Sequence, residues 1–166
     1  MAYLIAVPLL ALLAALQSSL VSHLRLLDGR PDLVLLTVVA WGLVAGTRSA
    51  MAWGLIGGLF LDSLTGVPFG TSTLALTVIG YLTSIGAGRF WQAHLLMPLA
   101  ATLVASAIFY GAEIGALLLS GRSLDLSYAG LRVVLPGTFL NLVLALPASQ
   151  LAEGLHRALF PPQVTV

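Results

Sequence analysis

Carboxylates within or beside apolar stretches are the residues of this chain best placed to do chemistry. Asp32 and Asp62 bound one such stretch, and Glu113 lies inside another, about two turns from its end. A charged group inside a membrane is costly, so it usually serves an ion or proton pathway or pairs with a partner. A pathway needs several such groups along one route, and the sequence places only Glu113 at depth. We therefore expect Glu113 to pair with Asn141 or with an arginine of another segment.

Asp62 has two interpretations. It ends an apolar run and precedes the turn Thr65-Gly66-Val67-Pro68-Phe69-Gly70. A carboxylate near a membrane face has a functional role by default only when it does not reach water, and the turn offers backbone amides that can donate hydrogen bonds to it. A functional carboxylate and a structural lock both remain open, and the turn favours the lock.

Small residues recur at helical spacing in several apolar runs. Gly54, Gly58 and Asp62 follow one another every four residues, with Gly57 beside them. In lipid, this spacing lets helix backbones approach closely. Similar stripes occur at Gly42 and Gly46, at Gly80, Ser84 and Gly88, and at Gly111 and Gly115. Tight internal packing is the favoured interpretation of each stripe, and contact with a partner's membrane helix is the alternative.

The remaining polar residues do not form a recognisable active site. The absence of cysteine excludes a thiolate zinc site and a thiol nucleophile. No nucleophile with a base, phosphate-binding loop or pair of carboxylates within reach emerges from the sequence. His23, His94 and His156 lie near the ends of apolar runs without metal-ligand spacing. We expect no catalysis, no metal and no cofactor.

Charge and aromatic residues point to a membrane and away from nucleic acid. Seven arginines, no lysine and a net charge of +1 are too few for a phosphate-binding stripe. Trp41, Trp53 and Trp91 fit membrane interfaces, where indoles are enriched, although Trp41 and Trp53 would also suit contact with a protein partner.

The overall composition predicts a protein dissolved in the bilayer. Hydrophobic residues make up 59% of the chain and charged residues 8%, against roughly 45–50% and about 25% in a soluble domain. The mean hydropathy is +1.05. We expect an all-α, polytopic integral membrane protein with one transmembrane domain over residues 1–166.

Six runs have the length needed to cross a hydrocarbon core, about 17–25 residues. A helix continuous through Arg48 would place this arginine at mid-membrane, so two spans in a tight hairpin fit better there. The first run is longer than a signal sequence allows and reads as a retained span. Three arginines on one side against four on the other do not orient the chain. The expected spans are 3–24, 31–47, 49–65, 70–88, 95–119 and 133–151, followed by a short amphipathic tail over 152–166.

A string of motifs resembles the rod-shape-determining MreD family. A Pro-Asp-Leu opening is followed by Trp-Gly-Leu, then by a glycine-rich helix ending in Leu-Asp, and then by a Gly-x-Pro-x-Gly turn. Here these motifs are Pro31-Asp32-Leu33, Trp41-Gly42-Leu43, Gly54 to Asp62, Gly66-Val67-Pro68-Phe69-Gly70 and the later Gly80-Tyr81-Leu82. The rest of the chain agrees with the family in length, number of spans and hydrophobicity.

The resemblance implies a function without turnover. It implies a protein of the bacterial cytoplasmic (inner) membrane with cytoplasmic termini, which binds the bitopic protein MreC. Such a protein helps link MreB filaments to the wall synthases RodA and a class B penicillin-binding protein, and so regulates cell shape. The implied fold is similar to the substrate-binding subunits of energy-coupling-factor vitamin transporters.

The residues expected to matter for structure or partner binding concentrate in the motif region. They are Pro31, Asp32, Trp41, Gly54, Gly58, Asp62, Gly66, Pro68 and Gly70, together with Glu113. The alternative function is a small-molecule-binding or transport subunit of the vitamin-transporter type. The implied fold favours it, as do Pro98, Pro136 and Pro147, which we expect to bend the last spans and open a cavity.

Overall fold

The structure is a computed structural model that describes residues 2–19, 28–90 and 96–160. This part of the chain contains helices and no strand, as the composition predicts. The first five helices are α1 (Ala2–Ser19), α2 (Leu33–Val44), α3 (Thr47–Leu64), α4 (Thr71–Phe90) and α5 (Leu96–Leu119). The last is a continuous rod of 34 residues, in which α6 (Leu126–Tyr128), a π-helical stretch (Ala129–Val134) and α7 (Leu135–Leu159) follow without a break.

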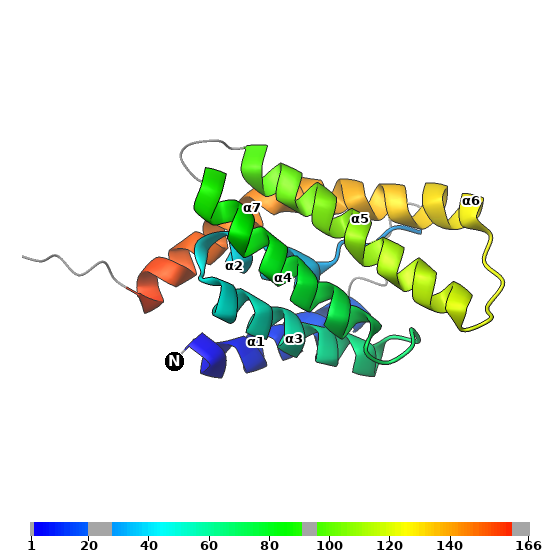
Figure 1. The fold of residues 1–166 in the computed structure, drawn as a ribbon, viewed down its shortest axis with the longest axis horizontal. Helices are drawn as coiled ribbons and strands as arrows, with labels where there is room; N and C mark the ends of the chain where they lie inside the picture. Colours follow the sequence, from blue (N-terminus) through cyan, green and yellow to red (C-terminus); the bar gives the residue numbers. More distant parts are fainter. Residues whose placement is uncertain (1, 20–27, 91–95, 161–166) are drawn as a thin grey trace, which may run out of the picture.

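Helix α2 is the centre of the bundle. It packs against α1, α3, α4, α5 and α7, and α1 and α3 lie along one side of the molecule with α5 and α7 along the other (Figure 1). Most of its residues are buried, from Val34 to Leu43. Twelve residues span about 18 Å, which is less than the roughly 30 Å of a hydrocarbon core. Helix α2 therefore depends on the longer helices around it to span the membrane.

Two helices are long and apolar enough to cross a membrane on their own, judged by length and composition. They are Leu96–Leu119 and the continuous Leu126–Leu159 rod. The shorter apolar helices are Ile5–Ser19, Leu33–Val44 and Thr71–Ala87. Large apolar side chains are exposed on the outer helices, for example Leu103 on α5 and Phe139 and Val143 on α7. Such a surface suits lipid as its solvent.

The C-terminal part of the rod differs from the expected span and tail. Helix α7 runs through Leu151 to Leu159 without interruption, so the residues expected to form a separate tail helix extend α7. His156 and Arg157 in its last turn suit the negative end of the helix dipole.

Pro136 leaves a backbone carbonyl free for a contact with another segment. A proline lacks the N–H that would bond the carbonyl four residues earlier, which here is that of Arg132. The π-helical stretch ends at this point, and the backbone N–H of Asp28 donates to the Arg132 carbonyl at 3.1 Å. The freed carbonyl thus ties the segment before α2 to the rod.

Candidate functional site

The Asp62 carboxylate joins the end of α3 to the start of α4. It is 5% exposed and accepts the backbone N–H of Ser72 at 2.9 Å, of Gly70 at 2.9 Å and of Thr73 at 3.1 Å. The Thr73 hydroxyl donates to it at 2.6 Å. These amides lie at the N-terminus of α4, where a negative charge also meets the positive end of the helix dipole. Asp62 therefore has a structural role here, since it holds the start of α4 against the end of α3.

The turn that follows is shaped to deliver these amides. Gly70 has φ +96°, a left-handed conformation that glycine adopts without steric cost. The Pro68 carbonyl accepts the backbone N–H of Thr71 at 3.2 Å and its hydroxyl at 2.7 Å. Gly66 is exposed, with open space where a Cβ would lie. Its contribution is confined to the turn itself.

The glycine stripe of α3 packs against α4. A Cβ built on Gly54 would lie 2.2 Å from the Leu76 carbonyl oxygen, and one on Gly58 would lie 2.3 Å from the Thr73 Cα. On the facing helix, a Cβ on Gly80 would lie 2.5 Å from the carbonyl oxygen of Ala50. Backbones approach this closely only through glycine. Gly54 and Gly58 are thus occupied within the molecule and leave no room for a partner's helix.

A second polar cluster joins four helices at the start of α2. Asp32 caps α2 by accepting the Leu35 N–H at 3.1 Å and also accepts the Gln17 side-chain amide of α1 at 3.1 Å. Its own backbone N–H donates to the Asn141 side-chain oxygen of α7 at 2.7 Å. The Asn141 amide in turn donates to the Ser106 hydroxyl of α5 at 3.2 Å. Buried polar groups satisfied in this way fix the relative positions of the helices.

A polar cavity of about 640 Å³ adjoins this cluster. Glu113 lines it, but the Asn141 amide expected to pair with Glu113 is instead engaged by Asp32 and Ser106. Within the described part of the chain, Glu113 has no hydrogen-bond partner. Tyr128 closes part of the rim by donating its hydroxyl to Asp28 at 2.7 Å. The polar residues of the described lining are Gln17, Ser18, Asp28, Arg30, Asp32, Thr65, Tyr110, Glu113 and Tyr128.

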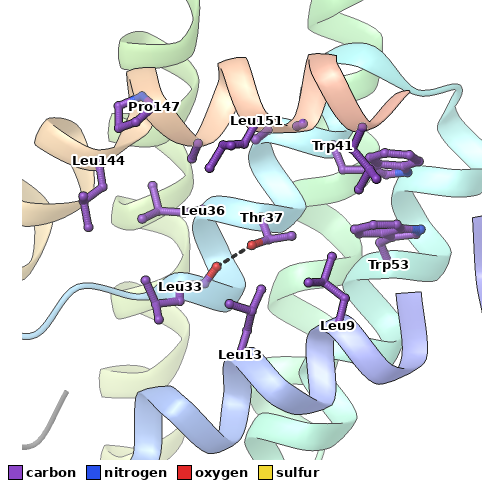
Figure 2. Close-up of a pocket in the computed structure, with 14 residues that line it drawn as sticks. Leu9, Leu13, Leu33, Leu36, Thr37, Trp41, Trp53, Leu144, Pro147 and Leu151 are labelled. Carbon is purple, nitrogen blue, oxygen red and sulfur yellow. Dashed lines mark hydrogen bonds between the residues drawn. The ribbon is translucent and has the colours of Figure 1, made fainter. Parts of the chain in front are cut away.

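The tryptophans Trp41 and Trp53 are part of the core. Their indoles stack with centroids 4.1 Å apart and planes 9° apart (Figure 2). They are 1% and 0% exposed, and Trp41 donates its indole N–H to the Ser49 hydroxyl at 2.9 Å. The expectation that these indoles face headgroups or a protein partner is wrong. Hydropathy does not separate an apolar residue inside the bundle from one facing lipid, because both environments are apolar.

Sequence reasoning missed the polar residues that build the cluster and its cavity. Gln17, Ser106 and Tyr110 are polar residues within apolar runs, and this isolation was the sequence signal that could have identified them.

The structure also places other residues named from the sequence. Pro31 is buried at the cavity wall. In residues 2–19, 28–90 and 96–160, no three His, Cys, Asp or Glu side chains lie close enough to hold a metal ion. The expected positions of His23, His94 and Trp91 lie outside the described residues.

Comparison with known proteins identifies the family. The family model for the rod shape-determining protein MreD matches residues 1–154, which cover nearly the whole helical bundle. No curated protein matches the chain. No solved structure matches it either. The chain belongs to the MreD family of membrane proteins, which has a role in determining rod shape.

Proposed function

We propose that this chain is a non-catalytic scaffold of the cell-elongation complex that binds MreC within the membrane. The match to the MreD family over residues 1–154 carries the proposal. Through MreC it helps couple MreB to RodA and a class B penicillin-binding protein. It works by holding partners side by side, without turnover.

The geometry of the polar groups supports a scaffold over an enzyme. Both oxygens of Asp62 are engaged by donors from the turn and α4, which leaves no lone acid or base there. Asp32 caps α2 and holds Gln17. Of the other two carboxylates that line the polar cavity, Asp28 accepts the Tyr128 hydroxyl. Glu113 is left alone, and a single carboxylate does not make an acid–base pair.

A surface of α5 suits a partner's membrane helix better than the stripe on α3 does. A Cβ on Gly111 or Gly115 would meet nothing within 4 Å, and these two residues lie four apart on one helix face. Glycines at this spacing allow close contact between membrane helices. The α3 glycines, by contrast, are already filled by α4. We therefore place the MreC contact on α5 around Gly111.

Co-purification of MreC with tagged variants tests this placement. Gly111→Leu adds bulk to the contact and should lower the yield of MreC per chain by about fivefold, the equivalent of ~1 kcal/mol of overpacking. Gly154→Leu is the matched control, because Gly154 is exposed on α7 with equally open space around it. Loss of MreC with both variants, or with neither, rejects the α5 contact. Absence of MreC from the wild-type preparation rejects the scaffold.

We also propose that the protein crosses the inner membrane several times and has cytoplasmic termini. Because the chain has no cysteine, single cysteines report topology without background. Ser120→Cys, at the end of α5, should react with a membrane-impermeant maleimide in intact spheroplasts. Gly46→Cys, between α2 and α3, should react only after lysis. The reverse pattern would invert the orientation.

The polar cavity favours a second candidate function, that of a small-molecule-binding subunit. Its volume of about 640 Å³ lies in the range of ligand sites, roughly 300–1,000 Å³. Native mass spectrometry of the purified chain should then show a retained polar ligand that is lost with Glu113→Gln. A scaffold retains MreC in that variant and carries no such ligand.

A further inference from the structure

An apolar groove runs between α1 and α7 over the surface of α2. Figure 2 shows α7 and α1 on either side of α2, with Leu151 of α7 and Leu9 of α1 facing the space between them. The groove has a volume of about 460 Å³. Its floor is buried, with Leu36 and Trp41 at 3% and 1% exposure, whereas Leu151 on its rim is 75% exposed. The groove is thus open to the surroundings of the bundle along α7.

The described lining of the groove offers water a single unpaired donor, the indole N–H of Trp53. The Thr37 hydroxyl donates to the Leu33 carbonyl at 2.7 Å, and the Trp41 indole N–H donates to Ser49. Cavities lined by apolar side chains do not hold water, since a water molecule needs two to four polar partners. In a membrane protein the available filler is hydrocarbon.

The dimensions of the groove suit a lipid acyl chain and are too small for a helix. On α7 it extends from Leu144 to Leu155, which is about 16 Å at 1.5 Å per residue. That is about half of a 30 Å hydrocarbon core, the depth of one leaflet. Even the whole empty space of the groove, about 1060 Å³ with its open side included, gives a cross-section of only about 65 Å² over this length, whereas a helix 10–12 Å wide needs about 80 Å² or more. A single methylene chain fits and a helix does not.

The end of the groove beside the stacked indoles carries aromatic and cationic groups. Trp41 meets His156 edge-on with ring centroids 5.6 Å apart. The Trp41 indole N–H donates to Ser49, and the neighbouring Arg48 is exposed and forms no ion pair with a described residue. Arg157 lies at this end too, but Glu153 pairs with it. The N-terminus of α3 at Gly46 has no side-chain cap. Free helix amides beside an arginine attract a phosphate.

We propose that this groove binds one acyl chain of an anionic phospholipid, whose headgroup lies at Arg48 and the first turn of α3. The chain passes Trp41 and Trp53 and ends near Leu33 and Leu144. The lipid would seal α1 to α7 and so complete the wall of the bundle around α2. This site is separate from the polar cavity and from the α5 surface.

Quenching of tryptophan fluorescence by brominated lipids tests the groove directly. In a Trp91→Phe background, Trp41 and Trp53 are the remaining indoles. Both are at most 1% exposed but line the groove, so an acyl chain in the groove comes nearer to them than lipid outside the bundle does. Phosphatidylglycerol with brominated acyl chains, titrated into the full chain in detergent, should quench their emission saturably at one lipid per chain. Quenching that never saturates, or no quenching, overturns the proposal.

Matched variants separate the acyl site from general lipid contact. Ala148→Phe places a ring in the groove and should abolish the saturable quenching, whereas Val143→Phe, on an exposed part of α7 outside the groove, should leave it intact. Equal quenching in the two variants overturns the acyl site. Native mass spectrometry of the wild-type chain provides a check independent of folding in either variant: one retained phospholipid is expected, and none, or a lipid of another class, overturns the proposal.

The headgroup assignment has its own test. Replacing Arg48 by Gln should weaken brominated phosphatidylglycerol about fivefold, the effect of one basic residue beside an anionic lipid. Phosphatidylcholine with the same chains should bind more weakly than phosphatidylglycerol, and its affinity should not change in the Arg48→Gln variant. Arg122→Gln is the control, since Arg122 is exposed beyond the far end of α5. Equal affinity for both lipids overturns the anionic headgroup.

Discussion

Removing the Asp62 carboxylate should destabilise the pairing of α3 with α4 more than any loss of an exposed cap. In Asp62→Ala, three backbone amides lose their acceptor, those of Gly70, Ser72 and Thr73. Each buried donor without a partner costs about 1–3 kcal/mol. Ser72 is 0% exposed, so its amide bears the full cost, whereas the others lie nearer the turn and regain partners more easily. We expect a total of about 3–5 kcal/mol.

Asp62→Asn separates hydrogen bonding from size. The asparagine oxygen can replace Oδ2, which accepts from Gly70 and from the amide and hydroxyl of Thr73. Its NH₂ group then faces the Ser72 N–H, so one donor meets another. One such conflict should cost about 1–3 kcal/mol, which places the asparagine variant between wild type and alanine.

Unfolding in mixed micelles measures these differences. Far-UV circular dichroism during titration with sodium dodecyl sulfate gives the free energy of unfolding for each variant. Asp125→Ala is the control, because Asp125 also caps a helix by accepting from Ser127 and Tyr128 but does so at an exposed position. It should cost about 1 kcal/mol. The reasoning is refuted if Asp62→Ala is no more destabilising than Asp125→Ala.

Three further substitutions, the first with a matched control, test the packing by the same measurement. Gly54→Ala forces a Cβ against a carbonyl 2.2 Å away and should cost about 1–3 kcal/mol, whereas Gly111→Ala enters open space and should be neutral or slightly stabilising; equal effects would contradict the packing of α3 on α4. Asn141→Leu strips the Asp32 N–H of its acceptor and should cost about 1–3 kcal/mol; a stabilised variant would show that the bond is dispensable. Trp41→Ala empties a site that is 1% exposed and should cost about 3–5 kcal/mol; a loss below about 1 kcal/mol would argue against its burial.

Sequence reasoning succeeded where the partners are close in the chain. Asp62 and the amides it accepts lie within 11 residues, so a turn motif sufficed to propose the lock. The helical class followed from composition, because a chain this apolar must satisfy its backbone within helices.

It was less successful where the partners are distant or the surroundings are uniformly apolar. Asp32 and Asn141 are 109 residues apart, and no local pattern connects them. Trp41 and Trp53 were expected at a boundary because hydrophobicity along a membrane helix does not mark its inner face. Pro136 was expected only to bend its helix, since the acceptance of the Asp28 amide by Arg132 depends on the tertiary fold.

The cluster at Asp32 has a consequence for biogenesis. The backbone amide that begins α2 is made early, but its acceptor, Asn141, emerges from the ribosome 109 residues later. Until α7 is inserted, the central helix therefore carries an unpaired donor at its start, and the Ser106 hydroxyl lacks the donor that Asn141 supplies. A chain interrupted before Asn141 keeps this polar end unsatisfied in the bilayer, which is costly. Insertion of α7 thus completes the cluster at Asp32.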